Sequence, residues 1–412
     1  MKKIFLTLLC LAFLLSFLAG CDFMGMGDGA DDTAESAAGS TVDSESATEE
    51  ETVPQQLTLS VDGTNISQYR IVYNSAAFTR EQCFEDLKAV GEALSAEIED
   101  LTGIKLPVVS DMEKATAKEI ILGVAIRAEC TRYYNEDTKL NIDEYCAVNA
   151  KGKILLGADC AAGVIDACEA FTGYIKEALA EGKTSLDIAA DFDVSGKKHV
   201  QRIVCVGDSI TQGCFVEDES KESYPAILQR ELGNEYDVVN LGKGGTTMSS
   251  YSCERYTTKS YIDKSGYYDT LLAIAPYTDL VVIMLGSNDA AGGEDTSDLF
   301  QNNYDTFKMD YTVNLTKMVT DLRAANAGIK IMVFSTTKTV SVRESNLVTY
   351  VRPLQKELAE KLKLDFYDMY SFSNQNMPID SDYSDTLHPT ATGYQKMGVE
   401  AAKILKERYN FT

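Results

Sequence analysis

The sequence predicts an α/β protein. A parallel β-sheet covered by helices on both faces is expected in residues 200–412, after a smaller α/β accessory domain in residues 56–196. Along the C-terminal half, apolar runs of strand length alternate with stretches of helical spacing, which favours a parallel sheet buried on both faces. The composition is globular, with 45% apolar and 25% charged residues, and 412 residues are enough for more than one domain.

The elements of the C-terminal domain follow from these runs. Strands are expected at 202–206, 236–240, 280–285, 330–334 and 364–367, and helices at about 224–232, 304–325, 347–362 and 391–408. In open parallel sheets the active site lies at the carboxyl ends of the strands. Residues that carry the chemistry should therefore come directly after strands.

The accessory domain shows a mixed pattern. Strands are expected at 56–61, 69–73, 105–109 and 119–123, a hairpin at 145–156, and helices at 80–101 and about 161–180. The strings LTGIKLPVV at 101–109 and EIILG at 119–123 loosely resemble the small domain that precedes the catalytic domain in some α-glucuronidases and β-hexosaminidases. The acidic residues are scattered, as on solvated helix faces, so no catalytic constellation is expected in this domain.

The N-terminus predicts export. Lys2 and Lys3 precede an apolar run over 4–19 that has the length of a signal-peptide core. The run ends in Leu-Ala-Gly-Cys21, so that residues 1–21 resemble the signal peptide with lipobox of bacterial lipoproteins, which implies cleavage before Cys21 and lipidation of Cys21 as the new N-terminus. An ordinary signal peptide with an incidental cysteine is the alternative. The protein is then expected to be extracytoplasmic and anchored to the cell membrane of the envelope, not to span it.

Residues 22–55 contain ten acidic residues and no basic one, and we expect them to form a disordered linker. The formal charge of −25 argues against nucleic-acid binding, which needs basic patches. Of the ten cysteines, Cys10 and Cys21 lie in the signal region. Most of the other eight are interpreted as small core residues, with disulfides left open.

A candidate nucleophile follows the first strand of the C-terminal domain. Ser209 lies in GDSITQG at 207–213. A serine hydroxyl needs a base within hydrogen-bond reach, and the chain has two histidines. His199 precedes the first strand, at the wrong edge of the sheet, and is given a surface role. His388, in DTLHP before the last helix, is the expected base.

The base in turn needs an orienting group. Asp385 lies three residues before His388, a spacing that puts a carboxylate and an imidazole on one face of a turn. Its expected role is to fix the imidazole tautomer and stabilise the imidazolium. The alternative is that Asp385 caps the turn while a backbone carbonyl orients His388.

Donors for a developing oxyanion follow the next two strands. The second strand precedes NLGKGGTT at 240–247, and the third precedes GSND at 286–289. Glycines let backbone N–H groups approach a substrate closely, and Asn288 offers a side-chain amide. Each block alone is compatible with an ordinary turn after a strand.

Together the four blocks resemble the SGNH (GDSL) hydrolase family, in the family's order and over about half of the chain. The resemblance implies a flavodoxin-like, three-layer domain that needs no cofactor and no metal. It implies Ser209 as nucleophile, His388 as base and Asp385 as orienter. The oxyanion hole would be the N–H groups of Ser209 and Gly245 with the side chain of Asn288. Gly242 and Gly244 are less favoured alternatives to Gly245, and Asp289 is interpreted as a structural neighbour.

The expected activity is that of a serine esterase forming an acyl-enzyme. Accessory-domain likeness and the envelope anchor favour acylated polysaccharides as substrate, acetyl esters first. A tyrosine-rich stretch at 251–268 could stack on sugar rings or simply cover the sheet; its members are Tyr251, Tyr256, Tyr261, Tyr267 and Tyr268. Two alternatives stay open: a lipolytic esterase or lysophospholipase on the same residues, and a non-catalytic envelope lipoprotein that binds glycans.

Overall fold

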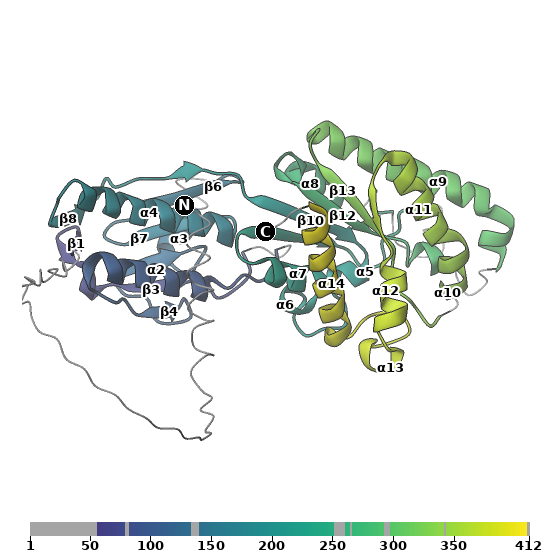
Figure 1. Cartoon of the computed structure of the whole chain (residues 1–412), viewed down its shortest axis with the longest axis horizontal. Helices are drawn as coiled ribbons and strands as arrows, with labels where there is room; N and C mark the ends of the chain where they lie inside the picture. Colours follow the sequence, from purple (N-terminus) through teal and green to yellow (C-terminus); the bar gives the residue numbers. More distant parts are fainter. Residues whose placement is uncertain are drawn as a thin grey trace, which may run out of the picture. The chain divides into compact units, whose positions relative to one another are not determined.

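The computed structural model describes residues 56–78, 82–132, 140–250, 260–263, 266–291, 297–341 and 343–409. These residues belong to one compact unit, Pro54–Thr412. They form a five-stranded parallel sheet in the C-terminal part and a six-stranded sheet in the N-terminal part, each with its own helices (Figure 1). The α/β fold class with a smaller preceding α/β part is confirmed. The signal, lipobox and linker of residues 1–55 lie outside the described residues.

The six-stranded sheet has the order β4-β3-β5-β7-β6-β9. Its strands are β3 (Arg70–Tyr73), β4 (Val108–Ser110), β5 (Glu119–Leu122), β6 (Glu144–Asn149), β7 (Ile154–Ala158) and β9 (Gly196–Lys197). A small sheet, ordered β2-β1-β8, adds β1 (Thr58–Val61), β2 (Thr64–Asn65) and β8 (Ser185–Ile188). The predicted hairpin is present as the antiparallel pair of β6 and β7.

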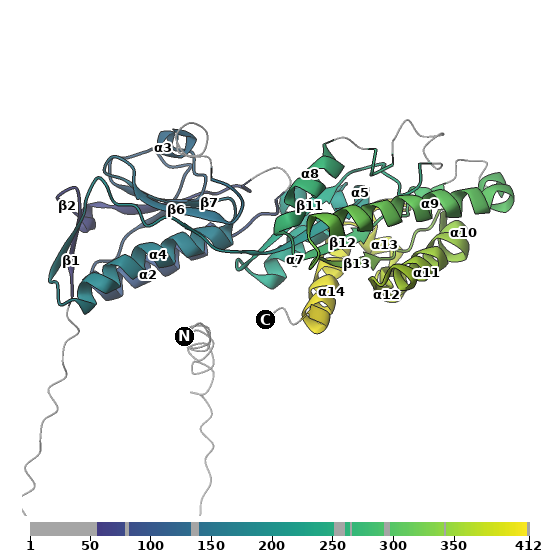
Figure 2. The same cartoon turned by 90° about the horizontal axis from the view of Figure 1, so that it is seen from above.

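Helices α2 (Leu87–Thr102) and α4 (Ala161–Ala180) run side by side and cover the six-stranded sheet (Figure 2). Their apolar side chains form one core with those of β3, β5 and β7. A short helix, α3 (Ala128–Arg132), and a 3₁₀ turn, Ile66–Gln68, complete this part. Helix α2 begins at Leu87 because Asp86 caps it by accepting hydrogen bonds from the N–H groups of Lys88 and Ala89.

The predicted start of that helix at residue 80 is therefore wrong. Gln82 forms an antiparallel bridge with Val239, and Cys83 is buried among Ile203 and Cys205 in the core of the C-terminal sheet. Gln82 pairs with a strand and Cys83 packs in the core, so neither belongs to a helical turn. Local periodicity cannot reveal such partners, because they lie more than a hundred residues further along the chain.

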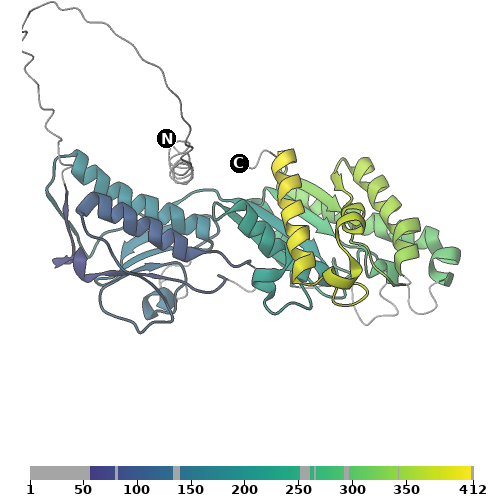
Figure 3. The same ribbon diagram turned by 60° about the horizontal axis from the view of Figure 1, so that its bottom comes forward.

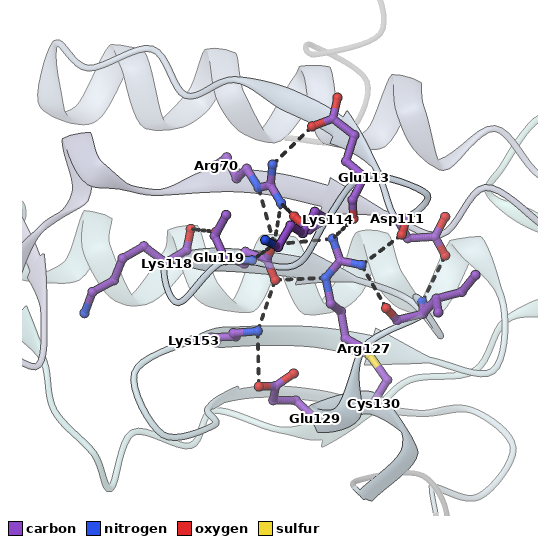
Figure 4. A network of polar contacts seen from close by, with 12 residues as sticks. Arg70, Asp111, Glu113, Lys114, Lys118, Glu119, Arg127, Glu129, Cys130 and Lys153 are labelled. Atoms are coloured by element: carbon purple, nitrogen blue, oxygen red, sulfur yellow. Dashed lines mark hydrogen bonds and ion pairs between the residues drawn. The ribbon is translucent and has the colours of Figure 1, made fainter.

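A buried ionic network lies within the N-terminal part (Figure 4). The carboxylate of Glu119 on β5 is fully buried and contacts Arg70 at 2.8 Å, Arg127 at 2.9 Å and Lys153 at 3.1 Å. Arg127 also donates to the carbonyl of Asp111, which ties the loop after β4 to the sheet. Three cations thus neutralise one buried carboxylate, and two of them are themselves almost fully buried.

The C-terminal sheet has the order β11-β10-β12-β13-β14 with every neighbouring pair parallel, which is the flavodoxin-like order. The strands are β10 (Gln201–Gly207), β11 (Tyr236–Gly242), β12 (Leu280–Met284), β13 (Lys330–Phe334) and β14 (Asp365–Tyr367). Successive residues of a strand alternate between two cores: Ile203 and Cys205 belong to one, and Val204 and Val206 to the other. Because both faces are buried, β12 and most of β10 are continuous apolar runs.

Helices form the two outer layers. Helices α7 (Tyr224–Leu232), α12 (Met369–Asn376) and α14 (Ala391–Tyr409) supply one core, and α8 (Tyr267–Ile274), α9 (Ser297–Ala325) and α11 (Arg352–Leu362) supply the other. Figures 1 and 3 show α14, in yellow, beside α7. Shorter elements are α5 (Ser209–Gln212), α6 (Glu219–Glu222), α10 (Arg343–Asn346), α13 (Ile379–Asp382), a π-helical turn Leu347–Val351, and 3₁₀ turns Ala275–Tyr277 and Asp289–Ala291.

Seven of the cysteines lie in the described residues, and none of these seven forms a disulfide. Six of them are buried, as expected for small core residues: Cys83, Cys130, Cys146, Cys160, Cys168 and Cys205. Within the described part of the chain, no helix combines the length and apolarity that crossing a membrane requires.

Candidate active site

The candidate nucleophile sits in a tight turn at the carboxyl end of β10. The strand ends at Gly207 and α5 begins at Ser209, with Asp208 between them capping the helix through a 2.9 Å hydrogen bond from the N–H of Ile210. A Cβ at Gly207 would lie 1.9 Å from the hydroxyl of Thr211, so only glycine fits this turn. The turn holds the Ser209 side chain at the edge of the sheet.

Ser209, His388 and Asp385 form a chain of hydrogen bonds. Ser209 Oγ lies 2.9 Å from His388 Nε2, and His388 Nδ1 lies 2.8 Å from Asp385 Oδ2. The other carboxylate oxygen, Oδ1, accepts from the backbone N–H groups of Leu387 at 2.7 Å and His388 at 2.6 Å. Asp385 therefore does both things considered from the sequence: it caps the turn and it contacts the imidazole.

The surroundings of Asp385 stabilise its charged form. Burial raises the pKa of this carboxyl, but the hydrogen bonds from the backbone and side chain of His388 outweigh burial and hold the pKa below its ordinary value. A carboxylate facing Nδ1 leaves Nε2 without a proton in the neutral ring, which is the tautomer that can accept the proton of Ser209.

The loop that carries His388 is fixed at both ends. Tyr383 bridges Pro389, and the N–H of Ser384 donates to the carbonyl of His388 at 2.8 Å, which closes the loop just before α14. The carbonyl of Thr386 accepts from the loop that follows β13. These contacts bring the imidazole back to the same sheet edge as Ser209.

The loop after β11 contains three glycines, and their N–H groups differ in what they bind. The N–H of Gly242 donates to Asn240 Oδ1 at 3.0 Å, and that of Gly244 donates to Gln212 Oε1 at 2.8 Å. Among the described residues, the N–H groups of Gly245 and Ser209 donate to no protein acceptor. Gly245, with φ at 78°, is thus the glycine of the loop whose N–H is available to a ligand.

Asn288 follows β12 and its amide is held in one orientation. Its Nδ2 donates to the carbonyl of Thr246 at 3.0 Å, and its Oδ1 lies 3.4 Å from Nη1 of Arg343. The second Nδ2 hydrogen remains for another acceptor. Arg343 also lies 3.4 Å from the carbonyl of Ser287, so it braces the whole turn; nothing in the sequence pattern pointed to it.

Asp289 lies in the core and not in the site. Its carboxylate accepts from the N–H groups of Met248 at 2.9 Å and Ser249 at 2.8 Å, and burial raises its pKa to about 7. It thereby joins the loop that contains Gly245 to the loop that contains Asn288, as a structural neighbour would.

His199 lies before β10, at the opposite end of the strand from Ser209. Its Nδ1 is 3.0 Å from Asp143 and its Nε2 is 3.1 Å from Asp279, and about half of its side chain is exposed. Burial opposes protonation, but the two carboxylates raise the pKa of His199. Its surroundings are those of a surface ion pair.

The described residues include only part of the tyrosine-rich stretch, and Tyr251 and Tyr256 lie outside them. Tyr261 is buried and donates to the carbonyl of Leu241, and Tyr268 donates to Asp321. These two tyrosines cover the sheet, which was one of the two interpretations.

Phe215 is a further residue at this site that the sequence pattern did not indicate. Its ring centroid lies 4.6 Å from that of the His388 imidazole. No group of three or more His, Cys, Asp or Glu side chains in the described residues is arranged to hold a metal ion.

Comparison with known proteins places this region. Residues 205–396 match the GDSL-like lipase/acylhydrolase family. A curated acetylxylan esterase from Xylanibacter ruminicola is 29% identical over 224 residues, which cover 51% of this chain and 44% of the relative, so the chain spans less than half of that protein.

Several solved structures are also similar to this chain. An aryl esterase of M. smegmatis is 19% identical and has a TM-score of 0.37, covering 50% of this chain and 99% of that one. A family two carbohydrate esterase from Clostridium thermocellum, in complex with cellohexaose, is 17% identical with a TM-score of 0.38, covering 55% and 70% of the two chains. The match over residues 205–396 shows that the C-terminal part of the chain is a domain of the GDSL-like lipase/acylhydrolase family.

Proposed function

We propose that the protein is a serine esterase that acts through an acyl-enzyme on Ser209. The observation that carries this proposal is the continuous chain Ser209–His388–Asp385, with links of 2.9 and 2.8 Å. Such a chain can make a serine hydroxyl nucleophilic, because the imidazole accepts its proton and the carboxylate stabilises the imidazolium that results.

In the first step Ser209 Oγ attacks the ester carbonyl and its proton passes to His388 Nε2. The negative charge on the carbonyl oxygen is received by the N–H groups of Ser209 and Gly245 and by Nδ2 of Asn288. Donors of this kind contribute about 3 kcal/mol each to transition-state stabilisation. The tetrahedral intermediate collapses, the alcohol leaves with the proton from Nε2, and the acyl group stays on Oγ.

In the second step water attacks the acyl-enzyme and gives a proton to His388 Nε2. The second tetrahedral intermediate uses the same donors. It collapses as Ser209 Oγ takes the proton back, and the carboxylic acid is released.

We propose an acetylated polysaccharide as the substrate. The support is the curated relative, an acetylxylan esterase that is 29% identical over 224 residues. A carbohydrate ester also fits the location that we propose, the outside of the cell membrane, where such polymers are met.

The proposed location rests on residues 1–21. The dibasic start, the apolar run and the Leu-Ala-Gly-Cys21 sequence support cleavage before Cys21 and its lipidation. Cells grown with an alkyne analogue of palmitate should yield labelled protein, and a Cys21→Ser variant should not be labelled. Equal labelling of the two would contradict the anchor.

The activity is tested with a panel of esters and a pair of variants. Wild-type protein should release acetate from acetylated xylan, and Ser209→Ala should lower kcat/KM by a factor on the order of 10⁴–10⁶. Ser384→Ala is the matched control: Ser384 is an exposed residue of the His388 loop whose hydroxyl makes one long hydrogen bond, 3.4 Å to the carbonyl of Pro389, and the variant should act like wild type. Undiminished activity in Ser209→Ala would refute the mechanism.

The same panel separates the alternatives. Release of long-chain acids from lipids without release of acetate would identify a lipolytic esterase. No release from any ester, together with no labelling of Ser209 by a fluorophosphonate, would identify a binding protein.

A further inference from the structure

Phe215 has an unusual backbone for its residue type. Its φ of 72° lies in the left-handed region, which a residue with a Cβ rarely adopts. The loop is pinned on its N-terminal side, where the N–H of Cys214 donates to the carbonyl of Ser209 and the Cys214 carbonyl accepts from the hydroxyl of Tyr394 at 3.2 Å. This anchoring holds Phe215 in a backbone conformation that is unfavourable for a residue with a Cβ.

The side chain of Phe215 is equally unusual. The residue is 64% exposed, and among the exposed large hydrophobic residues of the described chain it is the one with an aromatic ring. The ring meets the imidazole of His388 at 4.6 Å between centroids, with 36° between the planes. The imidazole side chain itself is only 15% exposed. An apolar ring surface therefore faces solvent directly beside the proposed base.

The chemistry of the proposed mechanism says which part of a substrate meets this surface. The leaving alcohol takes its proton from His388 Nε2, so the group that carries the alcohol must lie next to the imidazole. The carbonyl oxygen is received by other groups, the N–H of Gly245 and the amide of Asn288. Because the ring of Phe215 contacts the imidazole that protonates the alcohol, Phe215 borders the alcohol.

We infer that Phe215 is a specificity-determining platform on which the sugar ring bearing the acyl group stacks. This inference rests on the proposed function and adds the recognition of the alcohol. A pyranose ring has a face of C–H groups that packs on an aromatic ring, whereas a small alkyl alcohol is too short to cover it. The apolar exposure and the strained backbone of Phe215 are both accounted for if the ring is presented to a ligand.

The test compares two substrates that differ in the alcohol alone: an acetylated xylo-oligosaccharide and ethyl acetate. In Phe215→Ala, kcat/KM for the oligosaccharide should fall roughly three- to tenfold, the effect of losing one aromatic stacking contact, and mainly through KM. For ethyl acetate it should change by less than about twofold on the same estimate, with an unaltered pH profile. Phe215→Tyr should retain the activity on the oligosaccharide.

Met309→Ala is the matched control, because Met309 on α9 is also 64% exposed, and both substrates should be hydrolysed as by wild type. Equal losses on both substrates, or no loss on either, would overturn the platform. Wild-type hydrolysis of ethyl acetate without hydrolysis of the oligosaccharide would also overturn it, while leaving the esterase proposal intact. If wild-type protein hydrolyses neither ester, the proposed function is contradicted, and so is the platform that rests on it.

Discussion

Replacing Glu119 with glutamine tests the buried ionic network of the N-terminal part. Glutamine keeps the shape of the side chain and removes its charge. In the native protein the carboxylate is fully buried and lies 2.8 to 3.1 Å from the cationic groups of Arg70, Arg127 and Lys153 (Figure 4). The variant leaves these cations without their shared counter-ion, and Arg127 is only 2% exposed.

The magnitude follows from the pKa of Glu119. Burial raises this pKa, but hydrogen bonds from Arg127 and Arg70 outweigh burial and lower it from 4.5 to about 2. At about 1.36 kcal/mol per unit, the charged form gains about 3 kcal/mol from folding. Loss of one partner from a buried ion pair costs about 3–5 kcal/mol, which is the same range. We therefore expect Glu119→Gln to lower the free energy of unfolding by about 3 kcal/mol at pH 7.

The pH dependence has a definite sign. Because the pKa of Glu119 is lower in the folded state, its contribution is present above pH 4.5 and is lost as the pH falls from about 4.5 toward 2. The difference between wild type and variant should shrink over this range.

Urea unfolding followed by circular dichroism, at several pH values, measures this free energy. Glu113→Gln is the matched control: Glu113 also contacts Arg70, at 3.2 Å, but its side chain is 58% exposed, so the loss should stay below about 1 kcal/mol. Equal losses in the two variants would refute the reasoning. So would a difference from wild type that stayed constant from pH 7 to pH 2.5, the lower pH being near the folded pKa of about 2.

Three further predictions concern the candidate site. Asp385→Asn should lower kcat for acetate release by about 10²–10⁴, because an amide facing Nδ1 favours the wrong imidazole tautomer; unchanged kcat would mean that Asp385 only caps its turn. Asn288→Ala should lower kcat by about 10²–10³ with little change in KM, and a loss confined to KM would contradict the oxyanion role. Arg343→Met should lower kcat by about three- to tenfold, since the amide of Asn288 loses a weak 3.4 Å contact. Arg343→Lys should restore part of the lost activity. A loss in Arg343→Met as large as that in Asn288→Ala would show that Arg343 acts directly on the substrate.

Much of the C-terminal fold could be predicted because its sheet is buried on both faces. β10 and β12 are continuous apolar runs, since neighbouring residues such as Val281 and Val282 enter opposite cores. The helix α12 was not predicted: its sequence MYSFSNQN is largely polar, and its position depends on the cap by Asp368. Local periodicity reports burial on one face and carries little signal for such short elements.

The candidate site also contains residues that could be predicted from the sequence and residues that could not. Ser209, His388 and Asp385 could be placed from the sequence, because a rule of topology brings the carboxyl ends of parallel strands together. Their catalytic roles remain predictions. Phe215 and Arg343 could not be placed, because their relation to the site depends on how loops close. A positive φ at a phenylalanine and a contact between two residues that lie 55 positions apart have no signature in local sequence.

The strand order explains why a seven-residue motif can specify one site. In the sheet, β10 lies between β11 and β12, and all three strands are parallel. The loops that follow β11 and β12 therefore lie on either side of the carboxyl end of β10. Ser209 therefore has the Gly245 loop on one flank and the Asn288 loop on the other. A Cβ at Gly242 would lie 2.2 Å from the backbone nitrogen of Gln212, so α5 packs directly on the end of β11. A GDSITQG sequence after an edge strand would have the same turn but only one flanking loop, and it could not gather both sets of donors.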